Sequence, residues 1–162
     1  MNKELVLFRH GPAEERGFTA DFDRKLTPTG IEKTKQAVLG LQKLLNGKTL
    51  TLYSSPLVRA VETAEIIAKK LKLSFTQHAW IADGDIYYLR KALEKCENTL
   101  VIVGHEPTLS YWHHEFTGEY FEYKKSGAAL IQIRDNGSAE SLWAHTRKEL
   151  KKIGKAQNNI LK

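Results

Sequence analysis

The amino-acid sequence predicts an α/β protein, a three-layer α/β/α sandwich built around a mainly parallel sheet. Three short apolar runs, at residues 5–8, 50–53 and 100–103, are typical of strands that are buried on both faces. Each run is followed by a longer segment in which apolar residues recur every three or four positions, as they do in an amphipathic helix. This alternation of strand and helix indicates a parallel sheet covered by helices.

The first predicted helix begins and ends at recognisable signals. Pro28 suits the first turn of a helix, and Thr29 with Glu32 fits a capping box. A stripe of apolar residues runs from there to Leu45, and Gly47 marks the end of the helix. Similar patterns predict further helices at residues 57–71, 86–96 and 107–118.

The rest of the chain is expected to form loops, a short strand and a hairpin. Residues 13–25 are polar and typical of a loop, and a second loop is expected through Trp80 and Gly84. A short strand is expected near residues 74–77. Near the C-terminus, two strands are expected to pair as a hairpin at residues 128–134 and 140–145, around Asp135-Asn136-Gly137.

Length and composition fit one ordinary domain covering residues 1–162, with 41% hydrophobic and 27% charged residues. The apolar runs are far too short to span a membrane, and the first four residues show no signal-peptide pattern. The single cysteine, Cys96, excludes an internal disulfide and fits a reducing compartment. We therefore expect a cytoplasmic protein without a membrane partner, and we expect it to be a monomer or a weak dimer.

The net charge of +6 is concentrated in a basic C-terminal tail at residues 147–162. This tail holds six basic residues and only one acidic residue, Glu149, so it accounts for +5 of the total. Such a tail is expected to be a solvated helix or a frayed terminus, and docking on an acidic partner is the alternative. No nucleic-acid-binding signature accompanies it, so we expect no nucleic-acid partner.

Polar residues follow each of the three predicted parallel strands. The first strand ends at Arg9-His10-Gly11, the second leads to Arg59, and the third ends at Gly104-His105. Because the carboxyl ends of parallel strands lie at one edge of a sheet, these side chains are expected to meet there. Arg59 falls in the first turn of a helix, where the helix dipole opposes a cation unless an anion is bound nearby. Gly11 would allow a sharp turn or a close approach to a ligand.

These motifs resemble those of the histidine phosphatase superfamily. The resemblance rests on Arg9-His10-Gly11, on the segment SSPLVRAVETA at residues 54–64, and on Val103-Gly104-His105-Glu106-Pro107. The short chain and residues 21–30 look like the SixA-type phosphohistidine phosphatase branch, although Lys25 replaces a proline common in relatives. The resemblance implies a phosphoglycerate mutase-like fold without a cofactor. It also implies that His10 is a nucleophile that forms a phosphohistidine intermediate, with Arg9, Arg59 and His105 binding the phosphoryl oxygens.

The residue types suit phosphoryl transfer. Guanidinium groups offer forked donors that match phosphate, and they remain charged at any relevant pH. His10 must be neutral to attack, and we predict that its other ring nitrogen donates a hydrogen bond to the backbone. His105 is expected to add a hydrogen bond or, if protonated, a third positive charge. We expect no metal site, because His113 and His114 are adjacent and point apart on a helix.

The proton donor for the leaving group is the least defined part of this interpretation. Glu106 directly follows His105, where larger branches of the superfamily carry an acidic donor, and it is the first candidate. Four carboxylates of the loop after His10 are alternatives, namely Glu14, Glu15, Asp21 and Asp23. A phosphohistidine substrate relaxes this need, since its leaving nitrogen is more easily protonated than an alkoxide.

The expected partner is a phosphorylated protein of the histidine-containing phosphotransfer type. No long insertion forms a lid in the sequence, so the site is expected to be open, with residues 12–26 and 78–85 as its rim. Four aromatic residues of this rim are candidate partner contacts, namely Phe18, Phe22, Trp80 and Tyr87. The alternatives are a phosphatase for a small phosphoester and a module that binds a phosphorylated partner without turnover.

Overall fold

The computed structural model describes residues 2–156 and contains one six-stranded sheet with the strand order β3-β2-β4-β1-β5-β6. The strands are β1 (Lys3–Arg9), β2 (Leu50–Ser54), β3 (Phe75–Gln77), β4 (Thr99–Gly104), β5 (Ala128–Ile133) and β6 (Ala139–His145). The first four strands are parallel, and β5 and β6 form an antiparallel hairpin beside β1. The predicted fold class, a mainly parallel sheet between helices, is therefore confirmed.

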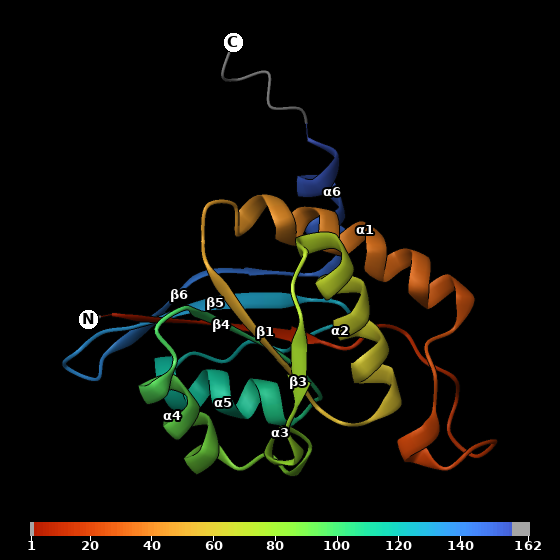
Figure 1. Ribbon diagram of the computed structural model, residues 1–162, viewed down its shortest axis with the longest axis horizontal. Coiled ribbons are helices and arrows are strands. Elements are labelled where there is room, and N and C mark those ends of the chain that lie inside the picture. The colour runs from red at the N-terminus through yellow and green to blue at the C-terminus, as the bar shows by residue number, and fades with distance from the viewer. Residues whose placement is uncertain (1, 157–162) are drawn as a thin grey trace.

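Helices cover both faces of the sheet. They are α1 (Pro28–Leu44), α2 (Val58–Leu71), α3 (Ala79–Asp83), α4 (Ile86–Lys95), α5 (Thr108–Thr117) and α6 (Arg147–Lys155), with a 3₁₀ turn η1 (Asp21–Asp23). In Figure 1, α1 and α6 lie above the sheet, and α3, α4 and α5 lie below it. None of the described helices combines the length and the apolar character that a membrane span requires.

The central strands are buried because each contributes side chains to both cores. In β1, Val6 and Phe8 pack with α1, α2 and α6, whereas Leu5 and Leu7 pack with α3, α4 and α5. The same alternation holds in the neighbouring β4, and the two strands are paired in parallel. This two-sided burial explains why these strands appear in the sequence as continuous apolar runs rather than as alternating patterns.

Two local expectations were wrong. The cap of α1 is Thr27, whose side chain accepts a hydrogen bond from the backbone N–H of Gly30, and Thr29 already lies inside the helix. The segment through Trp80 is the short helix α3 rather than a loop, and it ends at Gly84 in the left-handed conformation, with φ of 76°. The terminal hairpin is present as expected.

The basic tail is a docked helix and not a frayed terminus as far as Lys155. A capping box formed by Thr146 and Glu149 begins α6, and Leu150 is fully buried against α1. The two helices approach closely, since a Cβ atom added to Gly40 would lie 2.0 Å from the carbonyl oxygen of Leu150. The last part of the expected tail, residues 157–162, lies outside the described residues.

Candidate active site

The carboxyl ends of the three parallel strands converge as the sequence predicts. Arg9 pairs with Gly104 in register, and the backbone N–H of His10 donates to the carbonyl of Gly104 over 3.1 Å. The rings of His10 and His105 therefore lie side by side, with centroids 5.2 Å apart. Parallel pairing of neighbouring strands thus places both imidazoles at one edge of the sheet.

His10 is buried and oriented by the main chain. Only 5% of the residue is exposed, and its Nδ1 lies 2.8 Å from the carbonyl oxygen of Gly11. Because a carbonyl can only accept, Nδ1 carries the proton and Nε2 carries the lone pair. Burial above all, together with the charges of neighbouring Arg59 and Arg9, lowers the pKa of His10 to about 3. His10 is therefore a neutral imidazole with a nucleophilic Nε2, and the predicted backbone hydrogen bond is present.

His105 is held by a buried hydrogen bond to Ser55. Its Nε2 lies 2.7 Å from the hydroxyl of Ser55, which also accepts the N–H of Leu57. A hydroxyl has one hydrogen and two lone pairs, so it can donate to Nε2 or accept from it, and the contact allows either neutral tautomer. Among residues 2–156, the buried Nδ1 has no hydrogen-bond partner. Burial above all lowers the pKa of His105 to about 4, so the ring is neutral near pH 7 and is not a third cation.

The two arginines are each fastened at one end. Nη1 of Arg9 donates to the carbonyl of Tyr123 over 2.9 Å, and Nη1 of Arg59 donates to the carbonyl of Asp21 over 2.9 Å. In the part of the chain that the structure describes, Nε of Arg9 and Nε of Arg59 have no partner although both are buried. The Nε edge of a guanidinium is one that binds phosphate in forked fashion. On this edge Nε is without a partner in both arginines, but Nη2 of Arg59 also faces the Asp21 carboxylate at 3.4 Å.

A third, largely covered guanidinium was not predicted from the sequence. The side chain of Arg24 is only 11% exposed, and its Nε donates to Oδ1 of Asp21 over 3.0 Å. Asp21 also faces Nη2 of Arg59 at 3.4 Å and Nε of Arg16 at 3.9 Å. Burial raises the pKa of Asp21, but the charges of Arg59 and Arg24 outweigh this and leave the pKa lowered. Asp21 is thus a carboxylate held among three guanidiniums.

Comparison with known proteins agrees with this geometry. Residues 5–86 match the sequence model of the histidine phosphatase superfamily (branch 1). The chain belongs to this family. It is also 35% identical to an uncharacterized protein of Picosynechococcus sp., over 91% of this chain and 93% of that protein. A 2,3-bisphosphoglycerate-dependent phosphoglycerate mutase of Nautilia profundicola is 36% identical over 67% of this chain and 48% of the mutase.

Solved structures share the histidine phosphatase fold. The protein histidine phosphatase SixA complexed with tungstate superposes with a TM-score of 0.79 at 22% identity, covering 91% of this chain and 99% of SixA. Phosphoserine phosphatase of Entamoeba histolytica in complex with 3-phosphoglyceric acid gives a TM-score of 0.67 at 18% identity, over 91% and 99% of the two chains. At these identities the similarity shows the fold alone, and proteins that share a fold can act on different substrates.

The carboxylate of Glu106 is bound to the main chain in this histidine phosphatase site. Its Oε1 accepts the N–H of Ser110 over 2.8 Å, and its Oε2 accepts the N–H of Tyr123 over 3.0 Å. Both oxygens are thus engaged within the protein, and the role of Glu106 as a proton donor stays a prediction. Of the loop alternatives, Glu14 accepts the N–H of Lys25 within the loop itself. Asp23 and Glu15 are exposed.

Gly11 is required for close packing at the end of β1. A Cβ atom at this position would lie 2.1 Å from the hydroxyl oxygen of Thr34 on α1. Its N–H donates to the hydroxyl of Thr63 on α2 over 3.0 Å, and its carbonyl accepts from His10. Gly11 thus orients the histidine, and its expected role in substrate binding stays a prediction.

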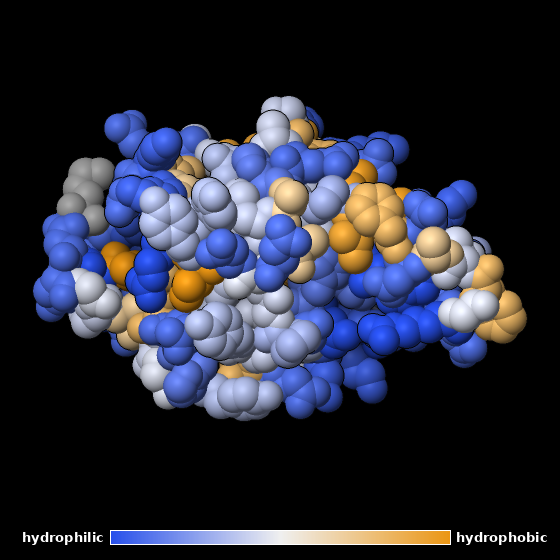
Figure 2. Space-filling model, turned by 90° about the horizontal axis from the view of Figure 1, so that it is seen from below, coloured by the Kyte–Doolittle hydropathy of each residue, from blue (hydrophilic) through white to orange (hydrophobic). Residues whose placement is uncertain are grey.

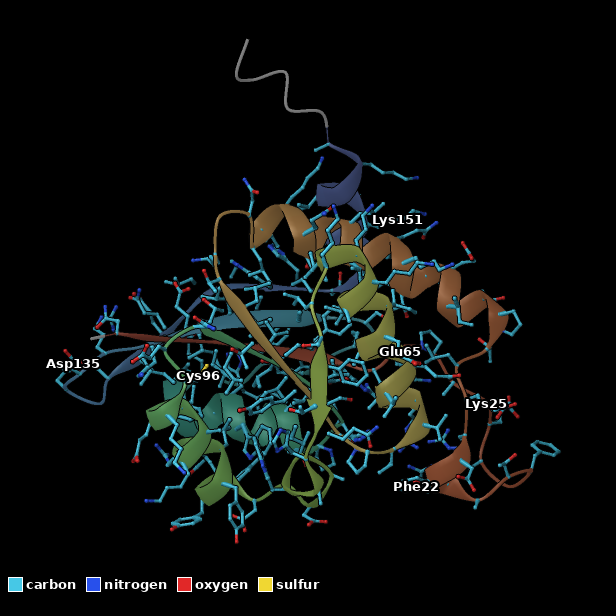
Figure 3. All side chains as sticks on the ribbon, viewed as in Figure 1. Phe22, Lys25, Glu65, Cys96, Asp135 and Lys151 are labelled. Atoms are coloured by element: carbon cyan, nitrogen blue, oxygen red, sulfur yellow. The ribbon has the colours of Figure 1, made fainter. Side chains whose placement is uncertain are left out.

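The rim contains exposed aromatic side chains next to the charged site. Phe18 is 85% exposed, and Phe22 and Tyr87 are about half exposed, whereas Trp80 is partly buried and lies close to Trp112. Figure 2 shows hydrophobic side chains beside strongly hydrophilic ones at the end of the molecule that carries residues 13–25. Figure 3 places Phe22 on this loop, apart from the sheet. Within residues 2–156, no three His, Cys, Asp or Glu side chains are grouped to hold a metal ion.

Proposed function

We propose that this member of the histidine phosphatase superfamily is a phosphatase that works through a phosphohistidine intermediate on His10. The observation that carries the proposal is the fixed tautomer of His10. Its Nδ1–H is bound to the carbonyl of Gly11, so Nε2 carries the lone pair. The pKa of His10 is far below neutrality, so this lone pair is free of a proton at pH 7. An imidazole in this state, beside two buried guanidiniums, suits attack on phosphorus.

The proposed reaction has two steps, formation of the phosphohistidine and its hydrolysis. Nε2 of His10 forms a bond to phosphorus while the bond to the leaving group breaks, and the leaving group takes up a proton from solvent water. Water then attacks the phosphohistidine, releases inorganic phosphate and regenerates the neutral imidazole. Arg9, Arg59 and His105 bind the equatorial oxygens, where the negative charge of the transition state is spread. None of these steps requires a metal ion.

The substrate that we propose is phosphohistidine on a protein. Two observations support it. Both oxygens of Glu106 accept main-chain N–H groups, and the charges of Arg59 and Arg24 lower the pKa of Asp21, so the site favours a leaving group that is easily protonated. Phe18 and Phe22 stand exposed on the loop beside Arg59 and offer an apolar contact to a protein surface. SixA, which shares the fold, is by name a protein histidine phosphatase.

A second candidate substrate is a small phosphoester with another anionic group. The observation that favours it is the position of Arg24 and Arg16 around Asp21, next to Arg59. A second phosphate or carboxylate of the substrate could replace Asp21 there. Relatives include a phosphoglycerate mutase and a phosphoserine phosphatase, whose substrates combine phosphate with other polar groups.

A direct comparison of substrates tests the proposal. Pure protein with chelator is incubated with a phosphohistidine-bearing phosphotransfer protein and, separately, with phosphoserine and sugar phosphates, and phosphate release is measured. We expect the phosphoprotein to be hydrolysed with the highest kcat/KM and an acid-labile phosphoenzyme to be trapped. His10→Ala is expected to lose both signals and still bind tungstate. Preference for a small ester would select the second candidate, and anion binding without any phosphoenzyme would indicate a binding module.

A further inference from the structure

Tyr123 lies in the irregular segment between α5 and β5, yet it is fully buried and bound at three atoms. Its N–H donates to Oε2 of Glu106 over 3.0 Å, and its carbonyl accepts Nη1 of Arg9 over 2.9 Å. Its hydroxyl lies 2.7 Å from Nδ1 of His113, which is also buried. The other oxygen of Glu106 accepts the N–H of Ser110 in the first turn of α5. One carboxylate thus joins a helix to the residue that fastens Arg9.

We propose that Glu106 is a positioning residue that sets the orientation of the Arg9 guanidinium through the main chain of Tyr123. The inference rests on the proposed function in one respect, that Arg9 binds the phosphoryl group. The sequence placed Glu106 near the reaction as an acid. The geometry instead indicates that Glu106 acts indirectly, through Tyr123 and Arg9, without contacting the substrate.

The argument begins with the guanidinium itself. An arginine side chain has several rotatable bonds, and an unfastened guanidinium would have to be ordered when the anion binds. The bond from Nη1 to the Tyr123 carbonyl fixes the plane of the Arg9 group and leaves the Nε edge unused. Arg9 is therefore held in a geometry that suits forked binding of phosphate before the substrate arrives.

The carbonyl of Tyr123 needs a support of its own, because an irregular segment has no sheet ladder to hold it. Glu106 supplies that support through the N–H of the same residue, and the hydroxyl of Tyr123 anchors the side chain to His113. The backbone of the segment is also tied to the strand end, since Ser126 donates its N–H to the carbonyl of Arg9 over 3.0 Å. Of these supports, Glu106 is the one that acts on the main chain of Tyr123.

Charge supports the same arrangement. Burial lowers the pKa of Arg9, and the nearby carboxylate of Glu106 opposes this shift and favours the charged guanidinium. The carboxylate does not bind Arg9 directly in the described contacts, so it does not compete with the phosphate for the Nε edge. An acid placed this way stabilises the cation without accepting a hydrogen bond from its Nε edge.

Glu106→Gln is the informative variant, because it keeps the size of the side chain and removes the charge. Its amide nitrogen would face one of the two N–H donors, so one hydrogen bond is lost. We expect the affinity for tungstate and the kcat/KM to fall by roughly ten- to a hundredfold, the scale of a hydrogen bond to a charged group. Glu119→Gln, an exposed glutamate on the same segment, is the matched control and should leave both unchanged.

Leaving groups separate positioning from proton donation. A series of aryl phosphates with different leaving-group acidity is hydrolysed by wild type and by Glu106→Gln. A positioning role predicts the same fractional loss for every member, together with weaker tungstate binding. A loss confined to the poor leaving groups, with tungstate binding intact, would overturn the proposal and make Glu106 the acid.

A double-mutant cycle tests the route through Arg9. In an Arg9→Ala background, Glu106→Gln should have no further effect on tungstate affinity measured by calorimetry, and an undiminished effect would contradict the proposal. If Glu106→Gln fails to fold, replacing the N–H of Tyr123 by an ester oxygen removes the same bond alone and should give the same loss. Tungstate binding does not depend on turnover, so an inactive wild type that binds tungstate would overturn the proposed function and leave this inference standing.

Discussion

The two arginines of the site each donate to a main-chain carbonyl, but only one of them also faces a carboxylate. Arg9 is bound to the carbonyl of Tyr123, a neutral group in a fully buried residue. Arg59 is bound to the carbonyl of Asp21, and its Nη2 also lies 3.4 Å from the Asp21 carboxylate, a side chain that is 56% exposed on the loop after β1. A phosphate competes with a carboxylate for the same donors, but a carbonyl on the opposite edge of the guanidinium does not compete with it. The Arg9 side of the site is therefore ready for an anion, whereas the Asp21 carboxylate must first move away from Arg59.

Removal of Arg59 gives the largest effect that this comparison predicts. Arg59→Ala is expected to lower kcat/KM by about two to three orders of magnitude, which is typical for loss of one pre-organised donor to a developing charge. Arg59→Lys should recover only part of this loss, because an ammonium keeps the charge but not the forked geometry. Steady-state kinetics with one aryl phosphate measure both variants.

The control for Arg59 is an arginine outside the site. Arg134 lies on the terminal hairpin and pairs with Glu140, so Arg134→Ala should leave kcat/KM unchanged. If Arg59→Ala were as active as Arg134→Ala, Arg59 would have no part in binding the phosphoryl group. Arg9 and Arg59 could then no longer be compared as two arginines that bind the same phosphoryl group.

The buried histidines predict how stability responds to acid. Burial lowers the pKa of His10 to about 3 and the pKa values of His105 and His113 to about 4. Between about pH 6.5 and these values, the unfolded chain binds protons that the folded chain does not, so folding becomes less favourable as the pH falls. Each histidine contributes a slope of roughly 1.4 kcal/mol per pH unit in this window.

Thermal unfolding between pH 7 and pH 4 measures this effect. His10→Asn should show a shallower loss of Tm on acidification than wild type, because one of the three buried histidines is absent. Replacement of the exposed His114 by Gln should leave the pH dependence as it is. A wild-type Tm that stays constant down to pH 4 would mean that these histidines are accessible to protons in the folded state.

The part of the site that strand ends and helix starts carry could largely be predicted from sequence. Arg9, His10, Arg59 and His105 all follow apolar runs or begin a helix, and the rules of parallel pairing bring such positions to one sheet edge. Even the hydrogen bond from His10 to the main chain was predicted correctly. Regular secondary structure made these inferences possible, because its geometry is the same in every protein.

The part of the site that irregular segments form could not be predicted. Arg24 sits in a polar loop with other basic residues, and nothing in its spacing distinguishes it from Arg16 or Lys25. The part played by Glu106 depends on Tyr123, which is 17 positions away in an irregular segment. The packing of α6 against α1 was not predicted for a related reason. The need for a glycine at position 40 is apparent only once Leu150 is seen to lie against it.

Asp21 offers the finest test of the comparison. Asp21→Asn removes the charge that occupies Arg59 and keeps the size of the side chain. Because the pair is largely exposed on the side of Asp21, the interaction is worth no more than about 0.2–1 kcal/mol. We expect tungstate affinity to rise by about two- to fivefold, with Asp23→Asn on the same 3₁₀ turn as the unchanged control. Weaker tungstate binding in Asp21→Asn would contradict this prediction. It would mean that the Asp21 carboxylate does not compete with the anion but orients Arg59 for it, as the carbonyl of Tyr123 orients Arg9.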